Sequence, residues 1–151
     1  LKTCEDLIFA KKMKKVGLKF KFDSKAIVFW RQKSSWGAAF WQLFGYAVGD
    51  GQSLLSLYSV HRKKIILLFG RYLLAIFLII FSFKWQILFS IFYLLLSLYL
   101  LWAILKNYRY IGAWQAIFIL PLFQLTADLA VILGTTVGFF KSLKSGKIQR
   151  P

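Results

Sequence analysis

The chain has 151 residues, of which 59% are hydrophobic and 19% aromatic, yet it carries a formal net charge of +16. Because soluble domains average about 45–50% apolar residues, this composition excludes an ordinary soluble protein and indicates that charged and apolar residues occupy different segments. The single Cys4 excludes an internal disulfide, and the basic stretches contain no motif that reads nucleic acid. Anionic lipid head groups or a phosphate-bearing substrate are therefore the expected partners, and nucleic acid is not.

A helix is expected near the N-terminus, beginning around the stretch Thr3-Cys4-Glu5-Asp6. Thr3 with Asp6 three residues later is a variant of the capping box, and the carboxylates lie in the first turn, where the helix dipole favours negative charge. A lysine-rich run follows, and Gly17 is suited to the position just after a helix ends. From these residues alone, Glu5 and Asp6 are more often helix-capping acids than catalytic ones.

Two short strands are expected next, at Leu18–Phe22 and Ala26–Trp30, on either side of a turn at residues 23–25. One helix and two strands within about 30 residues cannot bury a core of their own. The chain also opens on Leu1 without a signal peptide. We therefore expect a fragment whose N-terminal partner region is missing.

Residues 34–64 are the expected junction between water and membrane. Ser34 and Ser35 are suited to cap a helix, and the glycine-rich stretch at 49–51 is expected to end it. The apolar residues between them recur at helical spacing: Trp36, Phe40, Leu43, Phe44 and Ala47. A second short helix is expected at 54–60. Apolar faces with basic flanks are typical of helices that lie along a membrane surface, and a core helix of a soluble domain is the alternative.

The membrane region is expected at residues 65–140. Ile65–Phe83 and Trp85–Leu105 are each long enough to cross a bilayer as a helix, since about 20 apolar residues suffice. A tight turn at Lys84-Trp85 joins them. Basic clusters at 61–64 and 106–109 then flank the same end of this hairpin, so the positive-inside rule places that end in the cytoplasm.

The third apolar block, Ile111–Phe140, is too long for a simple span and is interrupted by Pro121. If this block crossed the membrane once, the cations of the basic tail at 141–151 would lie on the side opposite the cytoplasm, against the positive-inside rule. A re-entrant or surface-lying half after Pro121 would keep those cations in the cytoplasm. The sequence leaves both arrangements open, and hence two or three membrane helices.

Arg71 and Asp128 are ionisable residues inside otherwise apolar blocks. A charge in hydrocarbon is costly, so an intramembrane acid is a functional candidate by default. Arg71 is expected to extend toward the cytoplasmic head groups, or to face Asp128 across two helices and so offset part of the desolvation cost. A position of Asp128 at the interface and a contact with a lipid-linked acceptor are the remaining alternatives.

The order of segments in residues 1–60 resembles a known family. The runs TCEDLIF, KKVGLKF and DSKAIVFWR are similar to the closing section of the catalytic domain in processive and lipid-linked family 2 glycosyltransferases. The resemblance implies that Asp6 is the general base that deprotonates the acceptor hydroxyl in an inverting transfer, with Glu5 beside it. Such a step needs a carboxylate within hydrogen-bond reach of the hydroxyl.

The run WQLFGYAVG resembles the Q-x-x-R-W signature of polymer-forming synthases. In that family the signature lies on an interfacial helix and helps to hold the acceptor and the nucleotide diphosphate, and the matching residues here are Gln42 and Tyr46. Gly45 stands where the family has arginine, and it cannot supply bidentate phosphate contacts. Arg31 or Lys33 is a candidate for the phosphate role, and a solvated cation on the membrane face is the alternative.

The expected architecture is an α+β remnant of a GT-A catalytic domain at 1–33, interfacial amphipathic helices at 34–64 and a mostly α-helical membrane region at 65–140. The resemblance implies the C-terminal fragment of an inverting glycosyltransferase, inactive alone, that moves a sugar from a nucleotide-sugar donor to a lipid-linked or polysaccharide acceptor. It also implies a divalent metal (Mg or Mn) held by the missing N-terminal half, and an integral membrane protein with its catalytic part on the cytoplasmic face. The alternative is a small non-catalytic membrane protein, such as a scaffold or transporter subunit with a basic cytoplasmic arm.

Overall fold

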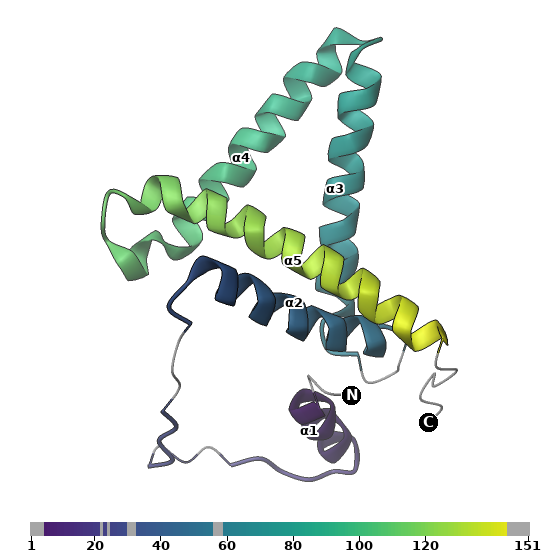
Figure 1. The fold of residues 1–151 in the computed structure, drawn as a ribbon, viewed down its shortest axis with the longest axis vertical. Coiled ribbons are helices and arrows are strands. Elements are labelled where there is room, and N and C mark those ends of the chain that lie inside the picture. The colour runs from purple at the N-terminus through teal and green to yellow at the C-terminus, as the bar shows by residue number, and fades with distance from the viewer. Residues whose placement is uncertain (1–4, 22, 24, 30–32, 56–58, 145–151) are drawn as a thin grey trace. The chain divides into compact units, whose positions relative to one another are not determined.

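The computed structural model describes residues 5–21, 23, 25–29, 33–55 and 59–144 (Figure 1). The regular elements within these ranges are all helices: α1 Glu5–Lys15, α2 Trp36–Ser53, α3 Arg62–Ser82, α4 Gln86–Ile111 and α5 Ala116–Lys144. The chain divides into two compact units, one of residues 1–62 with 130–151 and one of residues 63–129. Helix α5 begins in the second unit and ends in the first.

The expected α+β region at 1–33 is wrong, because the described residues of this region form one helix and no strand. Of the two expected strands, residues 18–21 and 26–29 have no regular structure, and Phe22 and Trp30 lie outside the described residues. An isolated strand is unstable unless a neighbour pairs its backbone groups and covers one face. Val28 and Phe29 are 82% and 94% exposed, so no described part of the chain covers these two side chains.

The turn expected at 23–25 is present, since the backbone N–H of Ala26 donates to the carbonyl of Asp23 at 3.2 Å. The end of α1 at Gly17 is also confirmed. Gly17 has a φ of 84°, its N–H donates to the carbonyl of Lys14, and the N–H of Leu18 donates to the carbonyl of Met13. This pair of bonds is the Schellman motif, which satisfies carbonyls that the last helical turn leaves unpaired.

Helix α2 begins as expected, because the Ser35 hydroxyl accepts a hydrogen bond from the backbone N–H of Ala38 at 3.2 Å. Its expected end at 49–51 is wrong, since the helix continues through both glycines to Ser53. Residues 54, 55, 59 and 60 of the expected second helix are not helical, and residues 56–58 lie outside the described part of the chain.

Close packing explains why Gly51 persists inside α2. Figure 1 shows α2 side by side with the C-terminal part of α5, and their backbones meet at small residues. A Cβ atom added to Gly134 would lie 2.5 Å from the carbonyl oxygen of Phe44 and 2.7 Å from the Cβ of Ala47. Cβ atoms added to Gly51 and Gly138 would lie closer still to backbone oxygens of the facing helix. The glycines therefore act as contact surface here, as small residues do between membrane helices.

In the second unit, α3 and α4 form a helical hairpin (Figure 1). The expected turn is confirmed, with the N–H groups of Lys84 and Trp85 both donating to the carbonyl of Phe81. Trp85 also stacks on Phe81, with ring centroids 6.1 Å apart. Helix α4 runs six residues past the expected end at Leu105, to Ile111, where Gly112 adopts a left-handed φ of 64°.

Three helices, α3, α4 and α5, are long and apolar enough to cross a membrane. The expected interruption of the third block at Pro121 is wrong, because α5 is continuous from Ala116 to Lys144. Pro121 has no backbone N–H, so the helical hydrogen bond to the carbonyl of Ile117 is absent. Membrane helices tolerate the loss of one such bond where neighbouring groups adjust. The chain is thus associated with a membrane through long helices.

The surface-lying position of α2 stays a prediction that a depth measurement can check. Phe40, Trp41 and Phe44 form an aromatic cluster on this helix, with Phe40–Trp41 and Trp41–Phe44 centroids each 5.4 Å apart. Aromatic residues favour the interface between head groups and hydrocarbon. A fluorophore attached at Phe40→Cys should therefore be quenched most by lipids labelled at the glycerol level. Strongest quenching by mid-chain labels, or by a water-soluble quencher, would contradict the surface position.

Candidate functional site

The most concentrated polar chemistry in the membrane helices surrounds Asp128. Its Oδ2 accepts hydrogen bonds from the Arg71 guanidinium, from the Tyr72 hydroxyl at 3.0 Å and from the Tyr99 hydroxyl at 2.7 Å. Its Oδ1 accepts from the Gln124 amide at 2.9 Å. The carboxylate is buried, so nearly all of its interactions are with protein groups.

Three helices contribute to this polar cluster. Arg71 and Tyr72 are neighbours on α3, Tyr99 comes from α4, and Gln124 lies one turn before Asp128 on α5. The Arg71 guanidinium carbon lies 4.6 Å from the centroid of the Tyr99 ring and 5.3 Å from that of Tyr72. Two aromatic faces and a carboxylate thus hold the arginine, and each contact is of a kind that stabilises a desolvated cation.

The expectation that Arg71 faces Asp128 is confirmed by their ion pair. The pair is electrically neutral, which removes most of the cost that either charge alone would have in hydrocarbon. Sequence reasoning missed Tyr72, Tyr99 and Gln124. The contact of Gln124 could have been predicted from the sequence, because Gln124 stands four residues before Asp128 and so lies on the same face of the helix. The contacts of Tyr72 and Tyr99 could not have been predicted, because tyrosine is common in membrane helices near interfaces without any polar partner.

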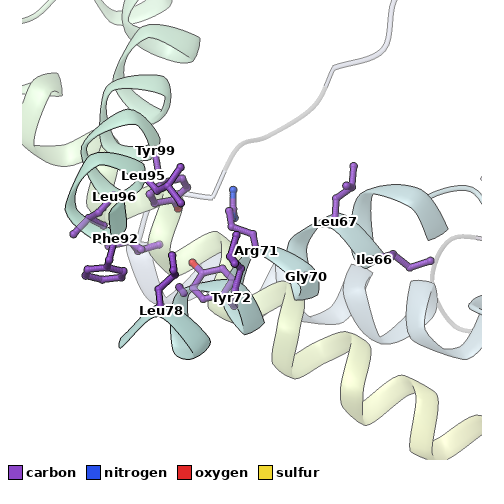
Figure 2. Close-up of a pocket in the computed structure, with 13 residues that line it drawn as sticks. Ile66, Leu67, Gly70, Arg71, Tyr72, Leu78, Phe92, Leu95, Leu96 and Tyr99 are labelled. Atoms are coloured by element: carbon purple, nitrogen blue, oxygen red, sulfur yellow. The ribbon is translucent and has the colours of Figure 1, made fainter. Parts of the chain in front are cut away.

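Beside the cluster lies an apolar groove of about 600 Å³, between α3 and α4 (Figure 2). Leu74 and Leu78 line it from α3, Phe92 and Leu96 line it from α4, and Leu125 of α5 also contributes. Ligand sites commonly measure about 300–1,000 Å³, and they combine apolar walls with a few polar groups. This groove has that composition.

Its polar groups belong to the cluster: Arg71, Tyr72 and Tyr99 are part of the lining. Figure 2 shows Arg71 and Tyr72 on one helix and Tyr99 on the other. The Arg71 side chain remains 37% exposed, whereas that of Asp128 is 8% exposed. The groove therefore presents the cation rather than the carboxylate.

The residues singled out by the family resemblance lie on α1 and α2. Asp6 is exposed in the first turn of α1, next to Glu5, where the helix begins. Its carboxylate makes no hydrogen bond or ion pair with the part of the chain that the structure describes. Gln42 and Tyr46 lie one turn apart on α2, and the Gln42 amide donates to the Tyr46 hydroxyl at 3.0 Å. Arg31 lies outside the described residues.

A hydrogen-bonded contact between Asp50 and His61 joins the end of α2 to the residues just before α3. Asp50 contacts Nδ1 of His61 at 3.0 Å, and the Arg62 side chain donates to the carbonyl of Leu54 at 2.9 Å. On α1, the Lys11 ammonium donates to the carbonyl of Ser59 at 2.8 Å. These contacts link α1, the end of α2 and the residues just before α3, and they leave Asp50 engaged locally.

Within the described ranges, no group of three or more His, Cys, Asp or Glu side chains is arranged to hold a metal ion. The divalent metal that the resemblance implies is expected to have its ligands outside this chain, so it remains a prediction and no chemistry is derived from it. Comparisons of the chain with protein families, with curated proteins and with solved structures find no match.

Proposed function

We propose that this chain is the membrane-anchored C-terminal part of an inverting glycosyltransferase. The whole protein would move a sugar from a nucleotide-sugar donor to a lipid-linked or polysaccharide acceptor at the cytoplasmic face of a membrane. The proposal rests on the resemblance of residues 1–60 to family 2 glycosyltransferases and on the geometry of Asp6. It does not require an α+β fold within this chain.

The observation that carries the proposal is the open position of Asp6. Asp23 accepts a hydrogen bond from the N–H of Lys25, Asp50 pairs with His61, and Asp128 is enclosed by its polar cluster. Asp6 is the aspartate whose carboxylate makes no such bond within the described residues. A general base must be free to accept the proton of an incoming hydroxyl, so an exposed and unengaged carboxylate suits that role.

The remaining features of the chain suit an enzyme that works at a membrane surface. A transferase acting on a lipid-linked or growing acceptor must stay close to the bilayer, and α3, α4 and α5 are long and apolar enough to anchor it. Gln42 and Tyr46 form a hydrogen-bonded pair on α2, where uncharged polar groups could contact a sugar hydroxyl. The phosphate role expected for Arg31 or Lys33 remains a prediction.

A substitution at Asp6 tests this function in the full-length protein. Asp6→Asn should lower sugar transfer by roughly 10²–10⁴-fold, the usual contribution of general-base assistance, because the amide cannot accept the proton. Donor binding should change little. The measurement is incorporation of label from a panel of radiolabelled nucleotide sugars into membrane lipid and glycan.

Asp23→Asn is the matched control, since Asp23 is also an exposed aspartate in the N-terminal region but already bonds to Lys25. It should leave the transfer rate near that of the unaltered protein. A normal rate in the Asp6→Asn protein would make Asp6 a helix-capping acid. Absence of sugar transfer by the unaltered full-length protein would instead favour the non-catalytic alternative, a scaffold or transporter subunit.

A further inference from the structure

The groove between α3 and α4 has one feature that lipid-facing surfaces normally lack, which is a guanidinium with unused donors. Among the described residues, Arg71 donates to Asp128 through Nη2 alone, and its remaining contacts are to tyrosine rings. A guanidinium carries five N–H groups. Arg71 therefore has several donors without an acceptor among the described residues at the wall of an apolar groove, where an unpaired polar group is costly. A ligand that brings a hydrogen-bond acceptor to this position would be stabilised.

The charge of the cluster indicates what kind of acceptor fits. Arg71 and Asp128 together are neutral, and a phosphate placed beside them would add an uncompensated negative charge within the membrane helices. An uncharged acceptor avoids that cost while still satisfying the N–H groups. The carbonyl oxygen of an ester is such an acceptor.

The basic ends of the hairpin indicate where the ligand's own charge would lie. Lys64 on α3 and Lys106 on α4 are exposed, and each stands seven residues along its helix from the polar cluster, at Arg71 and Tyr99 respectively. At 1.5 Å per residue, the cations lie about 10 Å from the cluster along the helix axes. Lys63 and Arg109 are exposed at the same ends.

This spacing is a few ångströms longer than the polar layer of one lipid leaflet, and the long lysine and arginine side chains can cover the difference. With a head-group phosphate beside the lysines, the ester groups lie between the phosphate and the hydrocarbon, in the polar layer about 5–8 Å thick that each leaflet adds to the core. A guanidinium that extends toward the head groups can reach that level. Below it, the acyl chains would follow the apolar walls formed by Leu74, Leu78 and Phe92.

We infer that this groove binds one anionic diacyl glycerophospholipid. Its phosphate faces the basic ends of α3 and α4, one ester carbonyl accepts hydrogen bonds from Arg71, and an acyl chain fills the groove. The site is independent of sugar transfer, since it uses none of the residues assigned to that function. It would hold a lipid as a lasting part of the membrane region.

Native mass spectrometry of the chain in detergent tests the site directly. With dioleoyl phosphatidylglycerol added to the micelles, we expect one lipid retained per chain. The diether analogue, with the same head group and chains but no ester carbonyl, should bind about tenfold more weakly, because hydrogen bonds to a charged donor are lost. Dioleoyl phosphatidylcholine should also bind more weakly, and glycerol 3-phosphate should not compete. The unaltered chain is used throughout, so these outcomes do not depend on a variant folding.

A groove-filling variant locates the lipid. Ala75 lines the groove and Leu73 on the same helix is 65% exposed outside it, so Ala75→Phe should abolish retention while Leu73→Phe should not. Ala75→Leu, a smaller replacement, should give partial loss, with helicity checked by circular dichroism. Equal binding of ester and ether lipids, equal binding of the two head groups, competition by glycerol 3-phosphate, or full retention in folded Ala75→Phe or Ala75→Leu protein would each overturn the inference.

Discussion

Replacing Asp128 with leucine is expected to destabilise the detergent-extracted chain by up to about 3–5 kcal/mol, the cost of removing one partner of a fully buried ion pair, because the Arg71 side chain left behind is 37% exposed. The substitution leaves the Arg71 cation without its carboxylate, and it leaves the Tyr72 and Tyr99 hydroxyls and the Gln124 amide without their acceptor. Arg71→Met alone should cost less, because three neutral donors still solvate the Asp128 carboxylate.

The double variant shows whether both single substitutions lose stability because the Arg71–Asp128 ion pair is broken. With Arg71→Met and Asp128→Leu together, no charge remains unpaired, so the loss should fall short of the sum of the single losses by more than about 0.5 kcal/mol. Thermal unfolding in detergent, followed by circular dichroism, measures all four species of the cycle. Asp128→Leu combined with Lys84→Met is the control, because Lys84 lies at the hairpin turn and should give simple additivity. Additivity in the Arg71 cycle as well would mean that the ion pair contributes nothing to stability.

The ion pair could be predicted from the sequence because its cause does not depend on the details of the fold. A cation and an acid in separate apolar blocks each need a partner, and each is the nearest candidate for the other. The tyrosine and glutamine donors depend on how three helices pack, which helical periodicity within one segment does not show. The same holds for the groove, since its walls come from residues on different helices.

The expected strands failed for a different reason. The alternating apolar residues at 18–22 and the apolar run at 26–30 are compatible with strands, but a strand forms only where another strand pairs with its backbone. No partner strand is present among the described residues, and Ile27, Val28 and Phe29 are exposed. The local turn at Asp23 and the helix end at Gly17 were predictable, because each depends on hydrogen bonds between residues close in sequence.

The glycines of α2 show a local rule overturned by packing. Two glycines around Asp50 lower helix propensity, by up to about 1 kcal/mol each, and so favour an end to the helix. At Gly51 the facing helix compensates, because the two backbones can approach there only where a side chain is absent. The sequence held a signal for this contact in the spacing Gly134-x-x-x-Gly138, which is typical of closely packed membrane helices.

Gly138→Ala is therefore expected to destabilise the packing of α2 against the C-terminal part of α5. The new methyl group would meet the backbone of Val48, including its carbonyl oxygen, and no side-chain rotation relieves that overlap. Overpacking of this kind costs about 1–3 kcal/mol, and more where backbone must move. Gly51→Ala should have a similar effect from the other helix, because its methyl group would meet the backbone of Thr135.

Gly45→Ala is the matched control within α2. Among the described residues, no atom of another segment lies within 4 Å of a Cβ added at Gly45, so alanine there should stabilise the helix by up to about 1 kcal/mol through its higher helix propensity. Gly45→Ala should raise the stability and Gly138→Ala should lower it, so the pair of substitutions distinguishes the effect of helix packing from that of helix propensity. Thermal unfolding in detergent shows whether each substitution raises or lowers the stability of the chain. Equal stabilisation by Gly45→Ala and Gly138→Ala would mean that the two helices do not approach at these glycines.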